Sequence, residues 1–352
     1  MTWANCRTVS LRPPESTPRR TVALPTSPGT PPATYLGRYQ QPQFGTKPAR
    51  SISMVPRTNI RRVNADGVSV FYREAGPADA PVVLLLHGFP TSSFQYRELI
   101  PRLAGRYRVI APDLPGFGFT EVAPERNYQY SFDALANTTL AFTDAMRLDR
   151  YALYVFDYGA PTGLRMAMAR PDRVAAIVSQ NGNAYEEGLG DAWAPIQRYW
   201  REPTAENREA VRRELSPAGL ASQCTHGVPH PERIAPEGYT LDAAMIARPG
   251  NMEIQLDLFL DYANNVKLYP AFHDYLRKFE PPLLAIWGRH DPFFIPAGAE
   301  AYRRDNPNAV VQFLDTGHFA LETHVDEVAS AMLDFLDRVG YGVVLGTRAG
   351  RV

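Results

Sequence analysis

Residues 151–163 have the sequence YALYVFDYGAPTG, and this stretch decides the fold of the chain. Its first six residues are apolar, β-branched or aromatic, which predicts a buried strand of a parallel sheet. The sequence after Gly159 is rich in Ala, Met and Arg and predicts a helix that runs to about residue 170. Because one tight turn joins strand to helix, Asp157 should lie at the carboxyl edge of the sheet, where α/β folds bind their ligands.

Length and composition limit the classes of protein to consider. A chain of 352 residues can form one large α/β domain with an insertion, or two smaller domains. Its 37 basic and 37 acidic residues balance, so neither a nucleic acid nor an anionic membrane surface is expected as a partner. No apolar run is long enough for a membrane span. Two distant cysteines and the absence of clustered Cys and His predict no disulfide framework, metal or cofactor.

The first 55 residues differ in composition from the rest of the chain. They are rich in Pro, Ser, Thr and Arg, contain Glu15 as their only acid, and show no apolar periodicity. We therefore expect a disordered tail, and a second short tail at residues 341–352. If this tail carries no targeting signal, the protein is expected in the cytoplasm. Two alternatives are a transit peptide, since the segment is basic and poor in acids, and a natural start at Met54.

Short apolar runs alternate with helical patterns through most of the remaining sequence. Residues 60–74 predict a hairpin around Asp66-Gly67. Further strands are expected at 82–86, 107–111, 174–179, 282–287 and 309–313, with helices from 93, over 131–146, from 296 and over 319–339. This alternation is typical of a mostly parallel, doubly wound sheet, here in two parts, 56–183 and 280–340.

Between these two parts the alternation stops. Residues 184–279 contain helical segments and a loop rich in Pro and His, but no convincing strand. The segment is too long to be a simple connection between neighbouring elements of a sheet. We therefore expect a helical domain inserted into the α/β core.

The turn at Asp157 resembles the nucleophile elbow of the α/β-hydrolases, G-x-S-x-G, with Asp157 at the serine position and Val155 at the first glycine. The aspartate form is similar to that of epoxide hydrolases and haloalkane dehalogenases. The resemblance implies an α/β-hydrolase fold in which residues 184–279 form the helical cap that this family inserts after the sixth strand. A structural alternative is that Asp157 only caps the following helix.

Two later loops fit the same family. The loop GRHDP, residues 288–292, resembles the one that carries the triad acid, and Gly317-His318-Phe319 occupies the place of the catalytic histidine. Asp157, Asp291 and His318 then follow the family order of nucleophile, acid and histidine, each after a predicted strand. In the same way HGFP, residues 87–90, resembles the oxyanion loop. The resemblance implies an oxyanion hole made by the backbone N–H groups of Phe89 and Tyr158.

An aspartate nucleophile implies a particular chemistry. A carboxylate is ionised at neutral pH and can displace a leaving group from a saturated carbon without help from a base. The product is an ester of the enzyme with the alkyl group of the substrate. His318, oriented by Asp291, would activate the water that hydrolyses this ester. We therefore expect a small apolar organic substrate and water as reactants, and a monomer or homodimer.

The leaving group depends on the inserted segment. Epoxide opening needs an acid, which epoxide hydrolases supply from two cap tyrosines; Tyr262 fits best and Tyr239 is a plausible partner. Haloalkane dehalogenases commonly have Trp after the nucleophile and many have Asn in the oxyanion loop, where this chain has Tyr158 and Phe89. Val155, where epoxide hydrolases often have Gly, points the other way. We expect an epoxide hydrolase, with haloalkane dehalogenase as the second hypothesis and a non-catalytic binding protein as the third.

Overall fold

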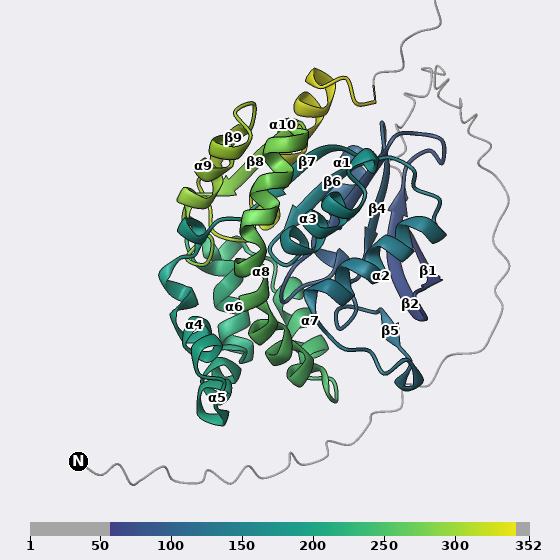
Figure 1. The fold of residues 1–352 in the computed structure, drawn as a ribbon. Coiled ribbons are helices and arrows are strands. Elements are labelled where there is room, and N and C mark those ends of the chain that lie inside the picture. Colours follow the sequence, from purple (N-terminus) through teal and green to yellow (C-terminus); the bar gives the residue numbers. More distant parts are fainter. Residues whose placement is uncertain (1–56, 343–352) are drawn as a thin grey trace, which may run out of the picture. The chain divides into compact units, whose positions relative to one another are not determined.

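The computed structural model describes residues 57–342 (Figure 1). The predicted tail 1–55 lies outside these residues, and so does residue 343 onwards of the predicted tail 341–352. Tyr341 differs from the expectation of a tail. Its ring stacks on Tyr107 with 6.1 Å between centroids, and its hydroxyl donates to the Val82 carbonyl at 2.7 Å. The packed core therefore extends past the predicted boundary at residue 340.

One nine-stranded sheet forms the centre of the described chain. The strands follow the order β1-β2-β4-β3-β6-β7-β8-β9, with β5 paired to β2. From β4 to β9 every neighbouring pair is parallel, whereas β1, β2 and β5 pair antiparallel. This confirms the mostly parallel sheet. The bounds are β1 Asn59–Ala65, β2 Val68–Ala75, β3 Val82–Leu86, β4 Arg108–Pro112, β5 Glu121–Val122, β6 Tyr151–Phe156, β7 Val174–Gln180, β8 Leu283–Gly288 and β9 Val310–Leu314.

Helices cover both faces of this sheet, as expected for a doubly wound fold (Figure 1). Along β3, Leu84 and Leu86 pack into a core with α2 (Phe132–Ala145), α3 (Gly159–Ala169) and α9 (Pro296–Asp305). Val83 and Leu85 point to the opposite face and pack with α1 (Leu99–Leu103) and α10 (Val325–Arg338). Both faces of the strand are therefore apolar, which is why its sequence is a continuous apolar run.

The segment between β7 and β8 is helical, as its sequence predicts. It contains α4 (Ala194–Arg201), α5 (Ala205–Glu214), α6 (Pro217–Thr225), α7 (Glu237–Ile246) and α8 (Asn251–Phe279), and no strand among its described residues. Figure 1 shows α4 to α7 in the lower part of the view, away from α10 and β9. The long helix α8 joins this segment to the core through contacts with α2 and α3. Across residues 57–342, no helix combines the length and apolar character needed to cross a bilayer.

Two local features differ from the sequence prediction. The strand β5 has only two residues and was not expected. The single helix predicted over 319–339 is divided into a short turn, Ala320–Glu322, and α10. The division falls at Thr323, whose hydroxyl lies 2.8 Å from the Thr316 hydroxyl. A side chain that bonds outside the helix in this way competes with helical geometry.

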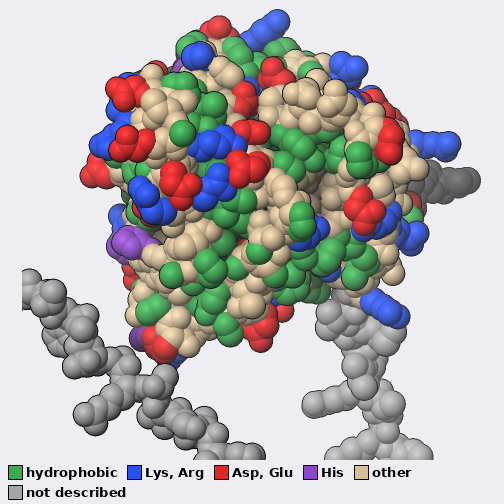
Figure 2. Space-filling view, turned by 90° about the horizontal axis from the view of Figure 1, so that it is seen from below, with side chains coloured by type: hydrophobic (Ala, Val, Ile, Leu, Met, Phe, Trp, Pro, Cys, Tyr) green, Lys and Arg blue, Asp and Glu red, His purple; other side chains and the backbone are tan. Residues whose placement is uncertain are grey.

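Acidic and basic side chains lie close together on the surface drawn in Figure 2. On α5 and α8, for example, Arg208 pairs with Glu253 and Asp257, each at 2.8 Å, and Arg212 pairs with Glu253 at 2.7 Å. The carboxylates of these pairs are more than half exposed. Such pairs contribute no more than about 1 kcal/mol each, so they matter less for stability than the apolar core.

Candidate active site

The turn after β6 holds Asp157 in a left-handed backbone conformation, with φ of 47°. This conformation is uncommon for a residue other than glycine and is found where the surrounding structure enforces it. Here two glycines allow close packing around the turn. A Cβ on Gly159 would collide with the Leu86 carbonyl, and one on Gly88 would collide with the Asp157 carboxylate. The turn and the loop after β3 are thus pressed together.

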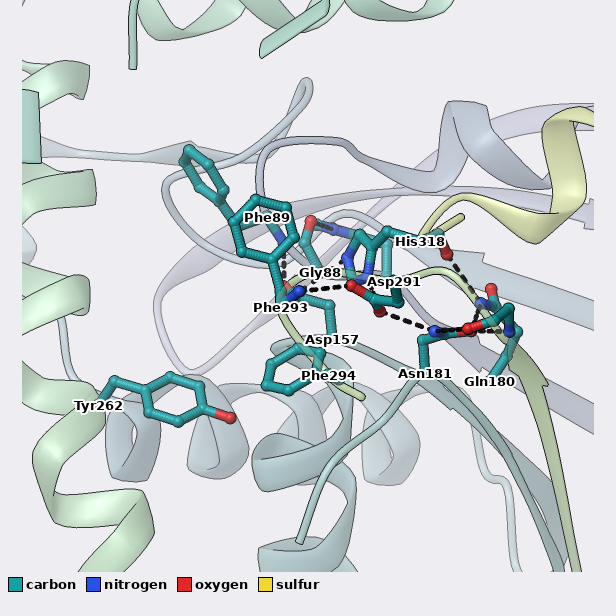
Figure 3. A network of polar contacts seen from close by, with 12 residues as sticks. Gly88, Phe89, Asp157, Gln180, Asn181, Tyr262, Asp291, Phe293, Phe294 and His318 are labelled. Atoms are coloured by element: carbon teal, nitrogen blue, oxygen red, sulfur yellow. Dashed lines mark hydrogen bonds and ion pairs between the residues drawn. The ribbon is translucent and has the colours of Figure 1, made fainter. Parts of the chain in front are cut away.

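The two oxygens of the Asp157 carboxylate lie in different surroundings (Figure 3). Oδ1 accepts a hydrogen bond from the Phe89 backbone N–H at 2.6 Å. The Tyr158 backbone N–H also acts on the carboxylate and lowers its pKa. Oδ2 faces the imidazole of His318, with 3.9 Å to Nε2. The structure therefore places the Phe89 N–H at one oxygen of the predicted nucleophile and His318 at the other.

His318 follows β9 and is held from its other side. Its Nδ1 lies 2.6 Å from Oδ2 of Asp291, which follows β8. The same oxygen accepts from Nδ2 of Asn181 at 2.7 Å, and Oδ1 of Asp291 accepts from the Phe293 N–H at 2.7 Å. His318 and Asp291 are 2% and 3% exposed, so these bonds lie out of water and fix the ring firmly.

Burial and neighbouring charges shift the pKa values of Asp157 and His318. Burial raises the pKa of Asp157 to about 6, although His318 and the two backbone N–H groups act in the opposite direction. Burial lowers the pKa of His318, but the charge and hydrogen bond of Asp291, helped by Asp157, outweigh it and leave that pKa above its usual value. Asp157 is thus ionised at neutral pH and is stabilised by its partners there.

A cavity of about 370 Å³ opens onto these groups. Its wall comes from the sheet edge and from the inserted helical segment together. Near Asp157 and His318 it is lined by aromatic side chains, and farther out by exposed polar ones. The lining residues are Phe89, Asp157, Tyr158, Asp191, Ala192, Trp193, Pro195, Ile196, Val211, Glu214, Leu215, Gly219, Ser222, Gln223, His226, Phe259, Pro292, Phe293 and His318.

Tyr262 lies immediately behind this wall. It is fully buried on α8, and its ring packs against Trp193 at 4.5 Å and Tyr158 at 5.7 Å between centroids. Its hydroxyl lies 3.4 Å from the Tyr269 hydroxyl, one tyrosine of the inserted segment against another. Figure 3 shows that hydroxyl directed toward the side where Phe294 and Asp157 lie. Tyr262 is therefore near the site without forming part of the cavity surface.

The structure does not bring Tyr239 to this cavity. Tyr239 lies on α7 and lines a separate small cavity with Thr91, Cys224 and Asp242. The sequence suggested Tyr239 only because it is a tyrosine in the inserted segment. How α7 packs against the core depends on contacts distant in sequence, and these place its tyrosine away from Asp157.

Sequence reasoning missed two residues of the site. Asn181, directly after β7, holds Asp291 with its Nδ2 and accepts the Gly288 N–H at 2.8 Å with its Oδ1. The only feature of the sequence that could have indicated Asn181 is its position directly after a core strand. Trp193 lines the cavity, and its indole N–H is buried without a described partner. Asp113 has a structural part instead, since its carboxylate accepts from the Ser93 and Phe119 N–H groups and fixes a loop.

With this geometry established, the sequence comparisons identify the class of protein. The sequence model of the α/β-hydrolase fold family matches residues 81–325, and the chain belongs to that family. An uncharacterized hydrolase of Saccharomyces cerevisiae is 51% identical over 272 residues, covering 76% of this chain and 93% of the relative. A haloalkane dehalogenase of Mycobacterium marinum is 32% identical over 273 residues, covering 72% and 87%. The relatives are thus hydrolases.

Solved structures agree with the fold. The haloalkane dehalogenase DatA of Agrobacterium tumefaciens superposes with a TM-score of 0.67 at 23% identity, covering 80% of this chain and 97% of that one. The epoxide hydrolase VrEH1 of Vigna radiata gives 0.63 at 23% identity, covering 80% and 98%. Both kinds of enzyme share this fold to a similar degree, so the likeness does not choose between them.

Proposed function

We propose that this chain is a hydrolase that attacks a saturated carbon with Asp157 and then hydrolyses the resulting ester with water activated by His318. The observation that carries the proposal is that the two oxygens of the Asp157 carboxylate have different neighbours. Oδ1 is bonded by the Phe89 N–H, whereas Oδ2 faces His318 at 3.9 Å without a hydrogen bond. Oδ2 is therefore the oxygen free to attack, and Oδ1 is placed where negative charge develops later.

The first half-reaction forms a bond between Oδ2 of Asp157 and the substrate carbon as the carbon–leaving group bond breaks. In the second, His318 takes a proton from water, and the hydroxide adds to Cγ of Asp157. The negative charge then falls on Oδ1, beside the Phe89 and Tyr158 N–H groups. Collapse of this intermediate breaks the Cγ–Oδ2 bond, and the product alcohol takes the proton from His318. Asp291 keeps the imidazole oriented throughout.

For the leaving group we favour an epoxide oxygen, which needs a proton as the ring opens. Tyr262 supports this proposal because its hydroxyl is buried beside that of Tyr269, in contact with residues of the cavity wall. The alkoxide would take the proton of Tyr262, and the proton left on Asp157 after hydrolysis would return to the tyrosinate. Since Tyr262 lies behind Trp193, the proposal includes a displacement of the Trp193 side chain when substrate binds.

Trp193 favours a second candidate, a haloalkane. A halide leaves without a proton but needs hydrogen-bond donors, and Trp193 lines the cavity with an indole N–H that is buried and has no described acceptor. The haloalkane dehalogenase at 32% identity also supports this alternative. In both cases the inserted helical segment would act as a cap, because it supplies the residue that stabilises the leaving group and much of the cavity wall.

One turnover in water that carries heavy oxygen tests the shared mechanism. The label should appear in the Asp157 carboxylate and not in the product, because water attacks Cγ and the product keeps Oδ2. Peptide mass spectrometry after proteolysis gives the position. Label found in the first-turnover product and absent from Asp157 would mean that water attacks the substrate directly, and would refute the ester.

Two variants, each tested on an epoxide and on a bromide, then distinguish the two candidate leaving groups. Tyr262→Phe removes the acid and should slow epoxide opening by roughly two to four orders of magnitude, with little effect on a matched haloalkane. Trp193→Phe removes the indole N–H and should slow dehalogenation instead. The substrates are a terminal epoxide and a primary bromide of the same chain length. If epoxide turnover survives Tyr262→Phe unchanged, or if only the bromide reacts, the epoxide proposal is wrong.

A further inference from the structure

The outer part of the cavity differs in charge from its inner part. Asp191, at the start of the turn Asp191–Trp193, and Glu214, the last residue of α5, both line the cavity and are exposed to solvent. Ser222 and His226 are exposed there too. Because these lining residues are exposed whereas Asp157 is buried, they mark the mouth through which a substrate enters.

No positive side chain balances the two carboxylates at this mouth. Among the described residues that line the cavity there is no lysine or arginine. Within residues 57–342, neither Asp191 nor Glu214 forms an ion pair. Arg213, which directly precedes Glu214, is exposed but does not line the cavity, and Arg212 is already bound to Glu209 and Glu253. A substrate therefore meets two carboxylates, with no lysine or arginine in the described cavity wall, before it reaches the nucleophile.

Between the mouth and Asp157 the wall is apolar and largely aromatic. Phe89, Tyr158, Trp193, Phe259 and Phe293 all line this part. Such a wall accepts an uncharged apolar body, and the faces of aromatic rings also attract cations rather than anions. A carboxylate at the distal end of a substrate would find neither a partner at the mouth nor favourable contacts inside.

We infer that Asp191 and Glu214 make this site selective for substrates with an apolar reactive end and a distal group that is cationic or neutral, and against carboxylates. The inference rests on the proposed function for the identity of the reactive end. Exposed charge pairs change an equilibrium by a factor of roughly 1.5 to 5 each. Two carboxylates should therefore favour a cationic substrate over a neutral one by roughly 2- to 25-fold and disfavour an anionic one by a similar factor.

Three substrates of equal length test this selectivity. They are terminal epoxides whose distal group is tert-butyl, trimethylammonium or carboxylate, and the corresponding primary bromides are used in parallel. The first two distal groups have nearly the same shape, so their ratio of kcat/KM reports charge alone. We expect the order cation, neutral, anion. We also expect the preference to shrink at high salt, because mobile ions screen exposed charges.

The double variant Asp191→Asn, Glu214→Gln should bring the three kcat/KM values together. Glu206→Gln is the matched control: Glu206 is exposed on the same helix as Glu214 but does not line the cavity, so this variant should keep the native order. Equal kcat/KM for the three substrates in the native protein would overturn the inference. So would a preference that survives in the double variant.

Binding of the product alcohols separates this inference from the proposed function. These compounds need no turnover, and quenching of Trp193 fluorescence reports their affinity, with Trp193→Phe showing which part of the signal arises at the cavity. If no epoxide or bromide reacts but the cationic alcohol binds more tightly than the anionic one, the proposed reaction fails and the selectivity stands. Equal affinities of the three alcohols would refute the selectivity whatever the reaction.

Discussion

His318→Gln should stop the reaction between its two halves. In the proposed mechanism Asp157 attacks the substrate as a carboxylate, and this step needs no base. Hydrolysis of the ester does need one, and His318 Nε2, 3.9 Å from Oδ2 of Asp157, is the base that the geometry places there. Loss of a general base slows a step by roughly two to four orders of magnitude. The alkyl ester of Asp157 should therefore accumulate in the variant.

The pH of this experiment follows from the pKa of Asp157. Burial already raises that pKa to about 6, and His318 is one of the groups that oppose the rise. Removing the imidazole therefore raises the Asp157 pKa further and leaves less carboxylate at neutral pH. A raised pKa means that the nucleophile is lost as the pH falls, so the experiment belongs at about pH 8.5, well above the titration of the group.

Intact-protein mass spectrometry during a single turnover is the assay. A species with the mass of protein plus the alkyl group should form at a rate within about tenfold of native alkylation. It should then decay with a barrier higher by roughly 3 to 5 kcal/mol, which is the expected loss in rate expressed as free energy. In the native protein the same species should be short-lived. Peptide analysis should place the added mass on Asp157.

His324→Gln serves as the control, since His324 lies six residues along the chain, before α10, and does not line the cavity. It should behave as the native protein. Two results for His318→Gln would refute the reasoning. Ester hydrolysis within tenfold of the native rate would show that another group activates the water. A protein that remains unmodified at about pH 8.5, while native Asp157 reacts, would show that His318 acts before the ester forms.

Four further predictions concern the same groups. Asp157→Asn, freshly prepared so that deamidation has not restored the acid, should show no turnover and no mass adduct. In the native protein, alkylation should decline as the pH falls through about 6, where Asp157 takes a proton. Esterification removes the Asp157 charge that helps to raise the His318 pKa, so the pKa of His318 should be lower in the ester than in the free protein. The pH at which ester hydrolysis declines should therefore lie below the His318 pKa measured by NMR in the free protein. In Asn181→Gly, glycine tolerates the left-handed backbone at this position, but the hydrogen bond to Asp291 is lost. The free energy of unfolding should fall by about 2 kcal/mol in denaturation experiments. Steady-state kinetics should show a lower kcat with little change in KM.

The sheet could be predicted well because its strands are buried on both faces. The apolar runs that became β3, β6 and β8 are continuous, and a strand covered by helices on each side requires such a run. The division of the last helix at Thr323 could not be predicted, since it depends on a hydroxyl from Thr316 on the preceding loop. No glycine or proline marks that position in the sequence.

Some residues of the candidate site could likewise be predicted from the sequence, and others could not. Asp157, Asp291 and His318 each follow a parallel strand directly, so chain order and strand ends suffice to bring them together at one edge. Tyr239 and Trp193 lie in the inserted segment, where no such rule applies. Which of their side chains reaches the cavity depends on how α7 and the turn Asp191–Trp193 pack against the core, and the sequence contains no local signal of that packing.

The leaving group is ambiguous for a physical reason and not only for lack of sequence signals. The first half-reaction demands the same carboxylate and the second the same histidine, whichever bond breaks. Only the stabilisation of the departing atom differs, and here Trp193, whose indole N–H is buried, lines the cavity with the ring of Tyr262 packed against it. An alkoxide must gain a proton, and Tyr262 can supply one whereas an indole cannot. Under the proposed mechanism, the position that the Trp193 side chain takes when substrate is bound should therefore decide whether an epoxide oxygen or a halide can leave.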